Sequence, residues 1–177
     1  MVGYASQKHI GCVGAKLLYP NQTIQHSGVV VGVGGIAMHA FVSTGRMQYG
    51  YFGRLVSVYD WSCVTAACLM TKREIFDEVG GFDEDFKVAC NDVDLCLKIR
   101  SLNKWIVEDV FSVWYHYESK SRGLEDTPEK QQRFSREVKC FRRKWERELL
   151  KGDPYYSPNL SLKEGDCSLR KAERNGD

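Results

Sequence analysis

Residues 71–100, TKREIFDEVGGFDEDFKVACNDVDLCLKIR, carry the signals of two helices separated by a glycine pair. Thr71 and Glu74 have the three-residue spacing of a capping box, which predicts a helix that begins near Thr71. Gly80 and the glycine after it predict the end of that helix. A second helix is expected to begin at Asn91, because Asn and Asp are favoured N-cap residues. Apolar residues at i, i+4 and i+7 form its expected buried face: Leu95, Ile99 and Leu102.

Apolar runs on both sides of this stretch predict β-strands. They lie at residues 10–19, 23–33, 55–70 and 104–113. A long amphipathic helix is expected at 129–150, because its apolar residues recur with helical spacing. Strands and helices in one core-forming chain place it in the α/β class.

The composition is that of a chain that can build a core. Of its 177 residues, 43% are hydrophobic and 12% are aromatic, which excludes a disordered protein. The seven cysteines include no CxxC pair, so we expect free thiols in a reducing compartment rather than disulfides or a structural zinc site. The longest weakly polar run, residues 28–42, is 15 residues long with four glycines, which is too short to span a bilayer.

The net charge of +2 is unevenly distributed. Residues 129–151 hold nine Lys or Arg and only four Glu. Three interpretations of this basic helix stay open: docking on the domain, contact with an anionic membrane surface, and contact with nucleic acid. Phe141 and Trp145 lie on its apolar face, which suits either docking or membrane contact. Docking is the favoured interpretation, and we expect no nucleic-acid partner. The expected organisation is a domain of residues 1–128, the helix packed on it, and a polar, frayed tail at 152–177.

Three sequence blocks follow one another in a characteristic order. They are GAKLLYPNQTIQHSGVVVGVGG (14–35), AACLMTKREIFDEVGGFDEDF (66–86) with NDVDLCLKIR (91–100), and WYHYESKSRG (114–123). In this order they resemble the C-terminal half of GT-A-fold family 2 glycosyltransferases, above all the rhamnosyltransferase-like enzymes of bacterial cell-surface polysaccharide synthesis. The resemblance covers residues 12–126 and implies a partial GT-A fold with a mixed sheet flanked by helices. The family's first half, a nucleotide-binding unit that ends in a metal-binding DxD motif, has no counterpart here, so we expect a fragment that is inactive alone.

The resemblance implies an inverting transfer of a sugar from a nucleotide-diphosphate donor to a glycan or lipid-linked acceptor. The family has an acidic pair at a helix start, and the second acid is the catalytic base. Here the pair is Asn91-Asp92, so Asp92 takes the base position and an amide replaces the first acid. A carboxylate can accept the proton of the acceptor hydroxyl as the new bond forms, and a helix N-terminus favours its ionised state. Two alternatives stay open: Asp92-Val93-Asp94 is a metal-binding DxD, or these residues only cap the helix.

The resemblance also assigns residues around the donor and the acceptor. His116 lies 24 residues after the base position, where family members place a metal-binding histidine. The implied metal is Mn²⁺ or Mg²⁺, and the absent DxD half would supply its other ligands. Ser121 and Arg122 lie in a loop that closes over the donor, where an arginine can pair with phosphate oxygens. Trp61 and Asp94 are assigned to the acceptor side, and Asp94 also supports the helix start.

The expected setting is the cytoplasm, with peripheral contact at the inner face of the membrane as an open alternative. An incomplete α/β sheet leaves an unpaired edge, so self-association into a homo-oligomer is also expected. The alternative function is a non-catalytic remnant of the same fold that binds a glycan or a protein partner.

Overall fold

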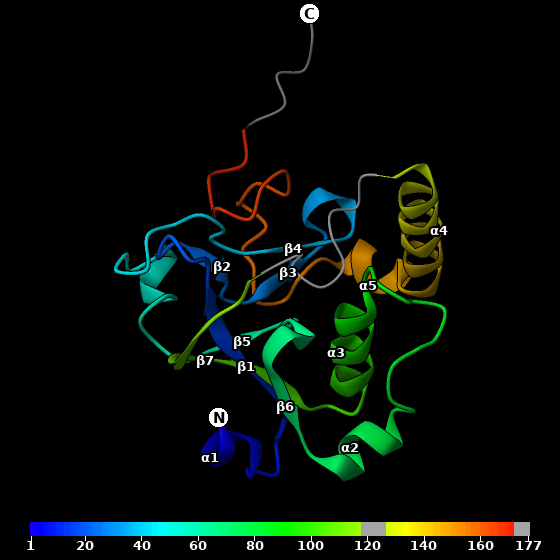
Figure 1. Cartoon of the computed structure of the whole chain (residues 1–177), viewed down its shortest axis with the longest axis horizontal. Coiled ribbons are helices and arrows are strands. Elements are labelled where there is room, and N and C mark those ends of the chain that lie inside the picture. Colours follow the sequence, from blue (N-terminus) through cyan, green and yellow to red (C-terminus); the bar gives the residue numbers. More distant parts are fainter. Residues whose placement is uncertain (118–126, 172–177) are drawn as a thin grey trace, which may run out of the picture.

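The chain folds into a mixed β-sheet with helices packed beside it (Figure 1). The computed structural model describes residues 1–117 and 127–171. The α-helices are α1 (Val2–Ala5), α2 (Arg73–Glu78), α3 (Asn91–Ser101), α4 (Pro128–Lys144) and α5 (Glu146–Lys151). The strands are β1 (Ile10–Leu18), β2 (Ile24–His26), β3 (Val29–Val31), β4 (Ala37–His39), β5 (Tyr59–Trp61), β6 (Leu69–Thr71) and β7 (Trp105–Tyr115). Short 3-10 helices are η1 (Val33–Gly35), η2 (Tyr51–Gly53) and η3 (Ala66–Cys68).

β1 lies at the centre of the five-stranded sheet, whose main order is β2-β1-β7-β5. β7 runs parallel to β1, with Glu108 opposite Gly14, whereas β2 and β6 pair with β1 antiparallel. β5 pairs antiparallel with β7, and β3 and β4 form a separate two-stranded sheet. All nine residues of β1 are buried, as expected for a strand that is covered on both faces. The sheet is therefore mixed, and the α/β class expected from the sequence is confirmed.

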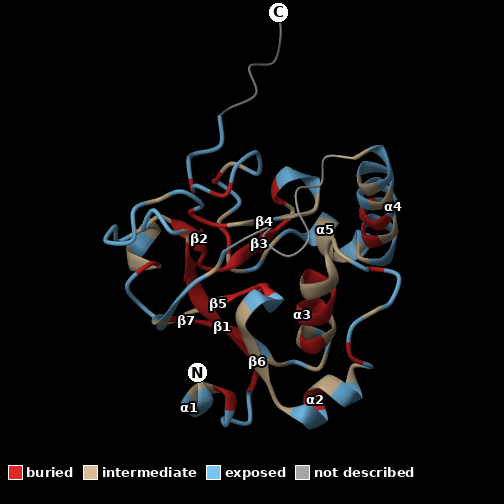
Figure 2. Cartoon of the chain, in the orientation of Figure 1, coloured by how far each residue is buried: buried red, intermediate tan, exposed pale blue. Residues whose placement is uncertain are grey.

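The larger apolar cluster fixes α3 against the sheet, and Figure 2 shows buried residues on β1 and on α3. Leu95 and Ile99 of α3 pack in one cluster with Ile106 of β7 and Phe141 of α4. Gly11 of β1 makes the close approach of α3 possible, because a Cβ at this position would collide with the side chain of Ile99. The helix face expected from the i, i+4, i+7 spacing is thus the face that is buried.

The helix expected near Thr71 begins two residues later, with α2. Thr71 lies in β6 opposite Cys12 of β1, and its hydroxyl donates a hydrogen bond of 2.6 Å to the carbonyl oxygen of Gly11. α2 has no side-chain cap. The expected capping box is therefore wrong, because pairing with β1 takes the threonine. The end of the helix is confirmed: α2 is followed by Gly80, whose φ of 75° is the left-handed conformation that glycine adopts without strain.

Two of the expected strands are shorter than the sequence indicated. The stretch 23–33 is divided into β2 and β3 at Gly28, which has a φ of 94°. A Cβ at Gly28 would also collide with the ring of Trp61, so this turn needs glycine for two reasons. The stretch 55–70 is mostly irregular and contains only β5, η3 and the start of β6. By contrast, the strands expected at 10–19 and 104–113 are confirmed as β1 and β7.

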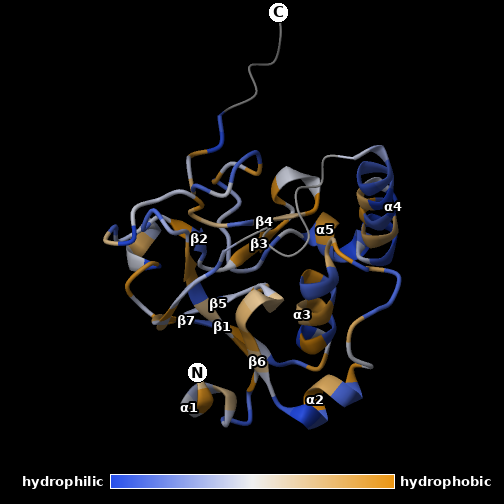
Figure 3. Cartoon of the chain, viewed as in Figure 1, coloured by the Kyte–Doolittle hydropathy of each residue, from blue (hydrophilic) through white to orange (hydrophobic). Residues whose placement is uncertain are grey.

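The long C-terminal helix expected as one element is two helices, α4 and α5, which meet at Trp145 (φ −110°, ψ 23°). α4 packs on the core through Val138 and Phe141, whereas Phe134 on the same expected stripe is 47% exposed. The rest of α4 is mostly hydrophilic (Figure 3). No helix within residues 1–117 and 127–171 has the length and apolarity needed to cross a membrane.

Residues 153–171 fold back onto the domain, so the expectation of a frayed tail is wrong for this part of the chain. The Asp153 carboxylate accepts a hydrogen bond of 2.8 Å from the backbone N–H of Val31. Tyr156 and Leu160 are buried in a second apolar cluster with residues of β1 and β5. The tail therefore closes the end of the sheet that α3 leaves uncovered.

Candidate functional site

The N-terminus of α3 is shaped by a left-handed residue and two capping side chains. Cys90 has a φ of 62°, which turns the chain into the helix at Asn91. The Oδ1 atom of Asn91 accepts a hydrogen bond of 2.8 Å from the N–H of Asp92. The Oδ1 atom of Asp92 accepts one of 2.9 Å from the N–H of Val93. Both bonds satisfy N–H groups that a helix start leaves unpaired. The N-cap residue itself is Cys90, which makes no side-chain cap hydrogen bond, so the expectation of an Asn or Asp at the N-cap is wrong by one residue.

Asp92 does more than cap, because its second oxygen reaches a different segment. Its Oδ2 atom accepts hydrogen bonds from the Thr65 hydroxyl (3.0 Å) and from the N–H of Ala66 (3.2 Å). The half-buried carboxylate thus accepts three hydrogen bonds from two segments, which fix its orientation. A carboxylate has about four lone-pair positions. The three bonds from the described residues therefore leave about one of these positions without a hydrogen bond.

Asp94, two residues further on, points into the protein and is 0% exposed. Its Oδ1 atom accepts a hydrogen bond of 2.7 Å from Trp145 Nε1 and lies 2.7 Å from Lys144 Nζ. Asp94 therefore ties α3 to the junction of α4 and α5, and Asp92 and Asp94 diverge. Within residues 1–117 and 127–171, no group of three or more His, Cys, Asp or Glu side chains could hold a metal ion. The acceptor-side role of Asp94 stays a prediction.

The contacts of Lys144 with Asp94 and Asp83 shift the pKa values of Lys144 and Asp83. Burial alone would lower the pKa of Lys144, but hydrogen bonds to Asp83 and Asp94 raise it above its usual value. The same Lys144 ammonium, 2.6 Å from Asp83, lowers the pKa of the Asp83 carboxyl, with help from the backbone N–H of Asp85. A cation at the end of α4 thus stabilises two carboxylates from two other segments.

A buried polar cluster lies behind the segment that holds Asp92. The N–H groups of Thr65 and Gly28 point to His26 Nε2, at 3.3 and 3.4 Å. His26 Nδ1 lies 3.1 Å from His39 Nδ1, and Glu108 Oε2 lies 3.4 Å from His26 Nε2. His26 and Glu108 are both completely buried. The position of Thr65, and through it of Asp92, therefore rests on a histidine in the protein interior.

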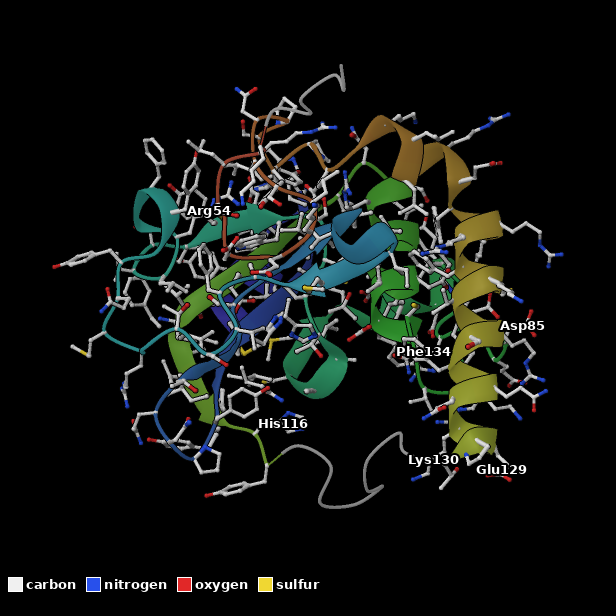
Figure 4. The ribbon with its side chains drawn as sticks, turned by 90° about the horizontal axis from the view of Figure 1, so that it is seen from above. Arg54, Asp85, His116, Glu129, Lys130 and Phe134 are labelled. Atoms are coloured by element: carbon white, nitrogen blue, oxygen red, sulfur yellow. The ribbon has the colours of Figure 1, made fainter. Side chains whose placement is uncertain are left out.

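His116 follows the end of β7 (Figure 4). Its backbone N–H donates a hydrogen bond of 3.0 Å to the carbonyl oxygen of Leu18, which extends the pairing of β7 with β1. Its Nδ1 atom lies 2.8 and 3.0 Å from the two amide atoms of Gln25. A metal-ligating histidine commonly has its second ring nitrogen held in this way, so the local geometry fits the predicted ligand. Ser121 and Arg122 lie outside the described residues.

Trp61 is packed into the second apolar cluster and is 1% exposed. The Arg54 guanidinium lies over its ring at 4.7 Å, and the ring of Phe41 meets it edge-on at 6.3 Å. The indole is therefore enclosed by the protein's own side chains. A direct contact of Trp61 with an acceptor stays a prediction, and Trp61 is not among the residues that the structure gathers around Asp92.

Sequence reasoning missed the residues that hold the expected site residues in place. Thr65 and Ala66 position Asp92, Gln25 positions His116, and Trp145 anchors Asp94. All of these contacts are long-range, and no local spacing in the sequence marks them. A usable signal was that Ala66 begins the block 66–86 and Thr65 directly precedes it.

Comparison with known proteins gives two similarities. The uncharacterized protein y4gI of Sinorhizobium fredii is 49% identical over 173 residues, which cover 96% of this chain and 19% of that protein. The O-antigen biosynthesis protein RfbC of Myxococcus xanthus is 38% identical over 181 residues, which cover 100% of this chain and 14% of that protein. The chain thus spans less than a fifth of the length of the curated relatives it matches. No protein-family model and no solved structure matches it.

Proposed function

We propose that this chain is the acceptor-side part of a family 2, GT-A-type glycosyltransferase that acts in polysaccharide synthesis, with Asp92 as its general base. The observation that carries the proposal is the Asp92 carboxylate, which is half-buried and held in one orientation by three donors from two segments. The likeness to a protein named for O-antigen biosynthesis supports the polysaccharide setting. The mixed α/β sheet is consistent with the proposed fold.

In the proposed reaction, the acceptor hydroxyl takes the remaining position at the Asp92 carboxylate. Asp92 accepts the hydroxyl proton while the acceptor oxygen bonds to the anomeric carbon of the donor sugar. The bond from that carbon to the nucleotide diphosphate breaks on the opposite side, and the diphosphate leaves with the electron pair. Thr65 and Ala66 keep the carboxylate still, so little reorientation is needed as the proton moves.

The donor side is proposed to lie at the end of β7. His116 would hold a divalent ion, with Gln25 orienting its ring, and Arg122 with Ser121 would contact the donor phosphates. When bound, Mn²⁺ or Mg²⁺ would neutralise charge on the departing diphosphate. We also propose a cytoplasmic site that is peripheral to the inner membrane face, a glycan or lipid-linked acceptor, and association of the chain with copies of itself.

The test is Asp92→Asn in the full-length protein that contains this chain, in a host strain that lacks the gene. The substitution keeps the shape of the side chain and removes the base. We expect surface polysaccharide, measured on gels, not to be restored, and release of nucleoside diphosphate by purified protein to fall by about 10²–10⁴-fold. The matched control is Asp77→Asn, an exposed aspartate on α2 that forms an ion pair with Arg73 on the same helix.

Circular dichroism of the Asp92→Asn protein separates loss of the base from loss of the fold. A folded Asp92→Asn protein that restores polysaccharide as well as the control would overturn the base assignment. The same outcome is what a non-catalytic glycan- or partner-binding remnant predicts, so the experiment distinguishes the two functions.

A further inference from the structure

A hollow on the outer side of the domain lies between α4 and residues 84–87. It has a volume of about 560 Å³, which falls within the range of small-molecule sites. Figure 4 places Asp85 beside the middle of α4. The lining holds four cations and two anions, which are Lys87, Arg136, Lys139, Arg143, Glu84 and Asp85. We call this hollow the α4 groove.

The two walls of the α4 groove are held together from beneath. Glu137 is 1% exposed, and its Oε2 atom accepts hydrogen bonds from the N–H groups of Val88 (3.3 Å) and Ala89 (2.6 Å). Phe86 meets Phe141 edge-on, with ring centroids 6.1 Å apart. The segment that carries Lys87 is thus fixed to α4 on its inner side, and the charged side chains extend from a built scaffold.

The cations of the α4 groove differ from the other cations on the same helix. Arg142 donates to the Gly35 carbonyl oxygen, and Lys144 bonds to Asp83 and Asp94. Across the described ranges 1–117 and 127–171, the four cations of the groove make no hydrogen bond or ion pair, although two carboxylates line the same hollow. Three of the four recur at i, i+3 and i+7, so one face of α4 gathers them: Arg136, Lys139 and Arg143.

We propose that the α4 groove binds a ligand with adjacent phosphate groups, such as a diphosphate. Four unpaired cations in one hollow repel one another, and an anion placed among them removes that repulsion. Two guanidinium groups offer the paired N–H donors that match phosphate oxygens. The volume exceeds what one phosphate requires, and positive charge comes from both walls, which favours two linked phosphates. Glu84 and Asp85 oppose the anion and limit its affinity.

This proposal does not rest on the proposed role of Asp92. The groove is formed by α4 and the segment before α3, and neither Asp92 nor His116 lines it. A chain without transferase activity would bind the same ligand, and an active transferase could lack this site. A negative result for one proposal therefore does not contradict the other.

The test uses the 177-residue chain and inorganic pyrophosphate, with binding measured by isothermal titration calorimetry at low salt. We expect a dissociation constant below about 1 mM, a loss of affinity at higher ionic strength, and at least a tenfold loss in the double variant Arg136→Gln, Arg143→Gln. The matched control is Arg147→Gln, Arg170→Gln, which removes the same charge from exposed positions outside the groove. The control should bind pyrophosphate as the wild type does.

A second variant tests whether the two carboxylates that line the α4 groove weaken anion binding. Glu84→Gln, Asp85→Asn removes the two opposing carboxylates and should tighten pyrophosphate binding several-fold. No binding by the wild type at 5 mM pyrophosphate, or an equal loss in the control variant, would overturn the proposal.

Vesicles of phosphatidylglycerol, compared with phosphatidylcholine, separate a soluble ligand from a lipid surface. Under the proposal, pyrophosphate binds the groove and competes away any vesicle binding that depends on Arg136 and Arg143. Vesicle binding that needs these arginines but that pyrophosphate cannot compete would overturn the diphosphate site in favour of a membrane contact.

Discussion

Replacing Trp145 with phenylalanine removes one hydrogen-bond donor from a buried carboxylate. Trp145 Nε1 lies 2.7 Å from Asp94 Oδ1, and Asp94 is completely buried. A hydrogen bond to a charged group contributes about 1.5–3 kcal/mol. Lys144 still reaches the same oxygen at 2.7 Å, so we expect the lower part of that range, about 1.5–2 kcal/mol. For a domain of this size the loss corresponds to a decrease in Tm of roughly 3–8 °C.

The measurement is urea unfolding followed by far-UV circular dichroism. We expect the slope of the unfolding free energy against urea concentration to stay the same as in the wild type. A double-mutant cycle with Asp94→Asn should give a coupling energy of about 1–2 kcal/mol, because the two groups share one bond. Trp105→Phe is the control: Trp105 is half-exposed and its ring meets His9 edge-on, so the loss of stability should stay within about 0.5 kcal/mol. A loss below about 0.5 kcal/mol for Trp145→Phe, or a coupling near zero, would show that this bond does not anchor α3.

Three further outcomes follow from the structure. Gly28→Ala should lower the free energy of unfolding by at least about 3 kcal/mol, because the new Cβ would clash with Trp61 and alanine is strained at this φ. Gly32→Ala should lower it by about 1 kcal/mol, because Gly32 has a φ of 97° but open space where the Cβ would lie. Equal losses for the two variants in urea unfolding would refute the clash. Asp83→Asn should reduce the dependence of the free energy of unfolding on pH in acid. The lowered pKa of Asp83 contributes stability that is present above about pH 4 and is lost as the pH falls through the pKa of the folded state. Parallel curves of unfolding free energy against pH for the two proteins would contradict this. Burial, then the charge of Asp92, raises the pKa of the Cys90 thiol to about 12. Iodoacetamide at pH 8 should therefore modify Cys90 at least about tenfold more slowly than an unperturbed thiol, because the smaller thiolate fraction outweighs the higher nucleophilicity of that thiolate; rapid labelling seen by mass spectrometry would refute this.

The sequence predicted α3, β1 and β7 correctly, because residues close together in the sequence determine where these elements begin. The start of α3 at Asn91 follows from residues that accept the N–H groups directly after them, and these bonds need no distant partner. β1 and β7 were predictable because they are long apolar runs. The base role of Asp92, by contrast, is implied by the resemblance to family 2 glycosyltransferases and not by a local signal, and it stays a prediction.

The failures have a common physical cause, which is a contact from a distant part of the chain. Thr71 had the correct spacing for a cap, but pairing with β1 took its hydroxyl. The break at Trp145 accompanies the bond of its indole to Asp94, which no helical periodicity can indicate. Polar composition suggested a frayed tail, but Tyr156 and Leu160 are enough to hold it on the sheet.

The folded-back tail has a consequence for how the chain acquires its structure during synthesis. Leu18 shares its apolar cluster with Tyr156 and Cys167, which follow it in the chain and are therefore made later. Such contacts between distant parts of a chain slow folding. Until they form, Trp61 and its neighbours lack their cover, and exposed apolar surface of this kind promotes aggregation. A growing polypeptide therefore holds an unfinished sheet until residues 153–171 have left the ribosome, and this interval is when a chaperone would engage it.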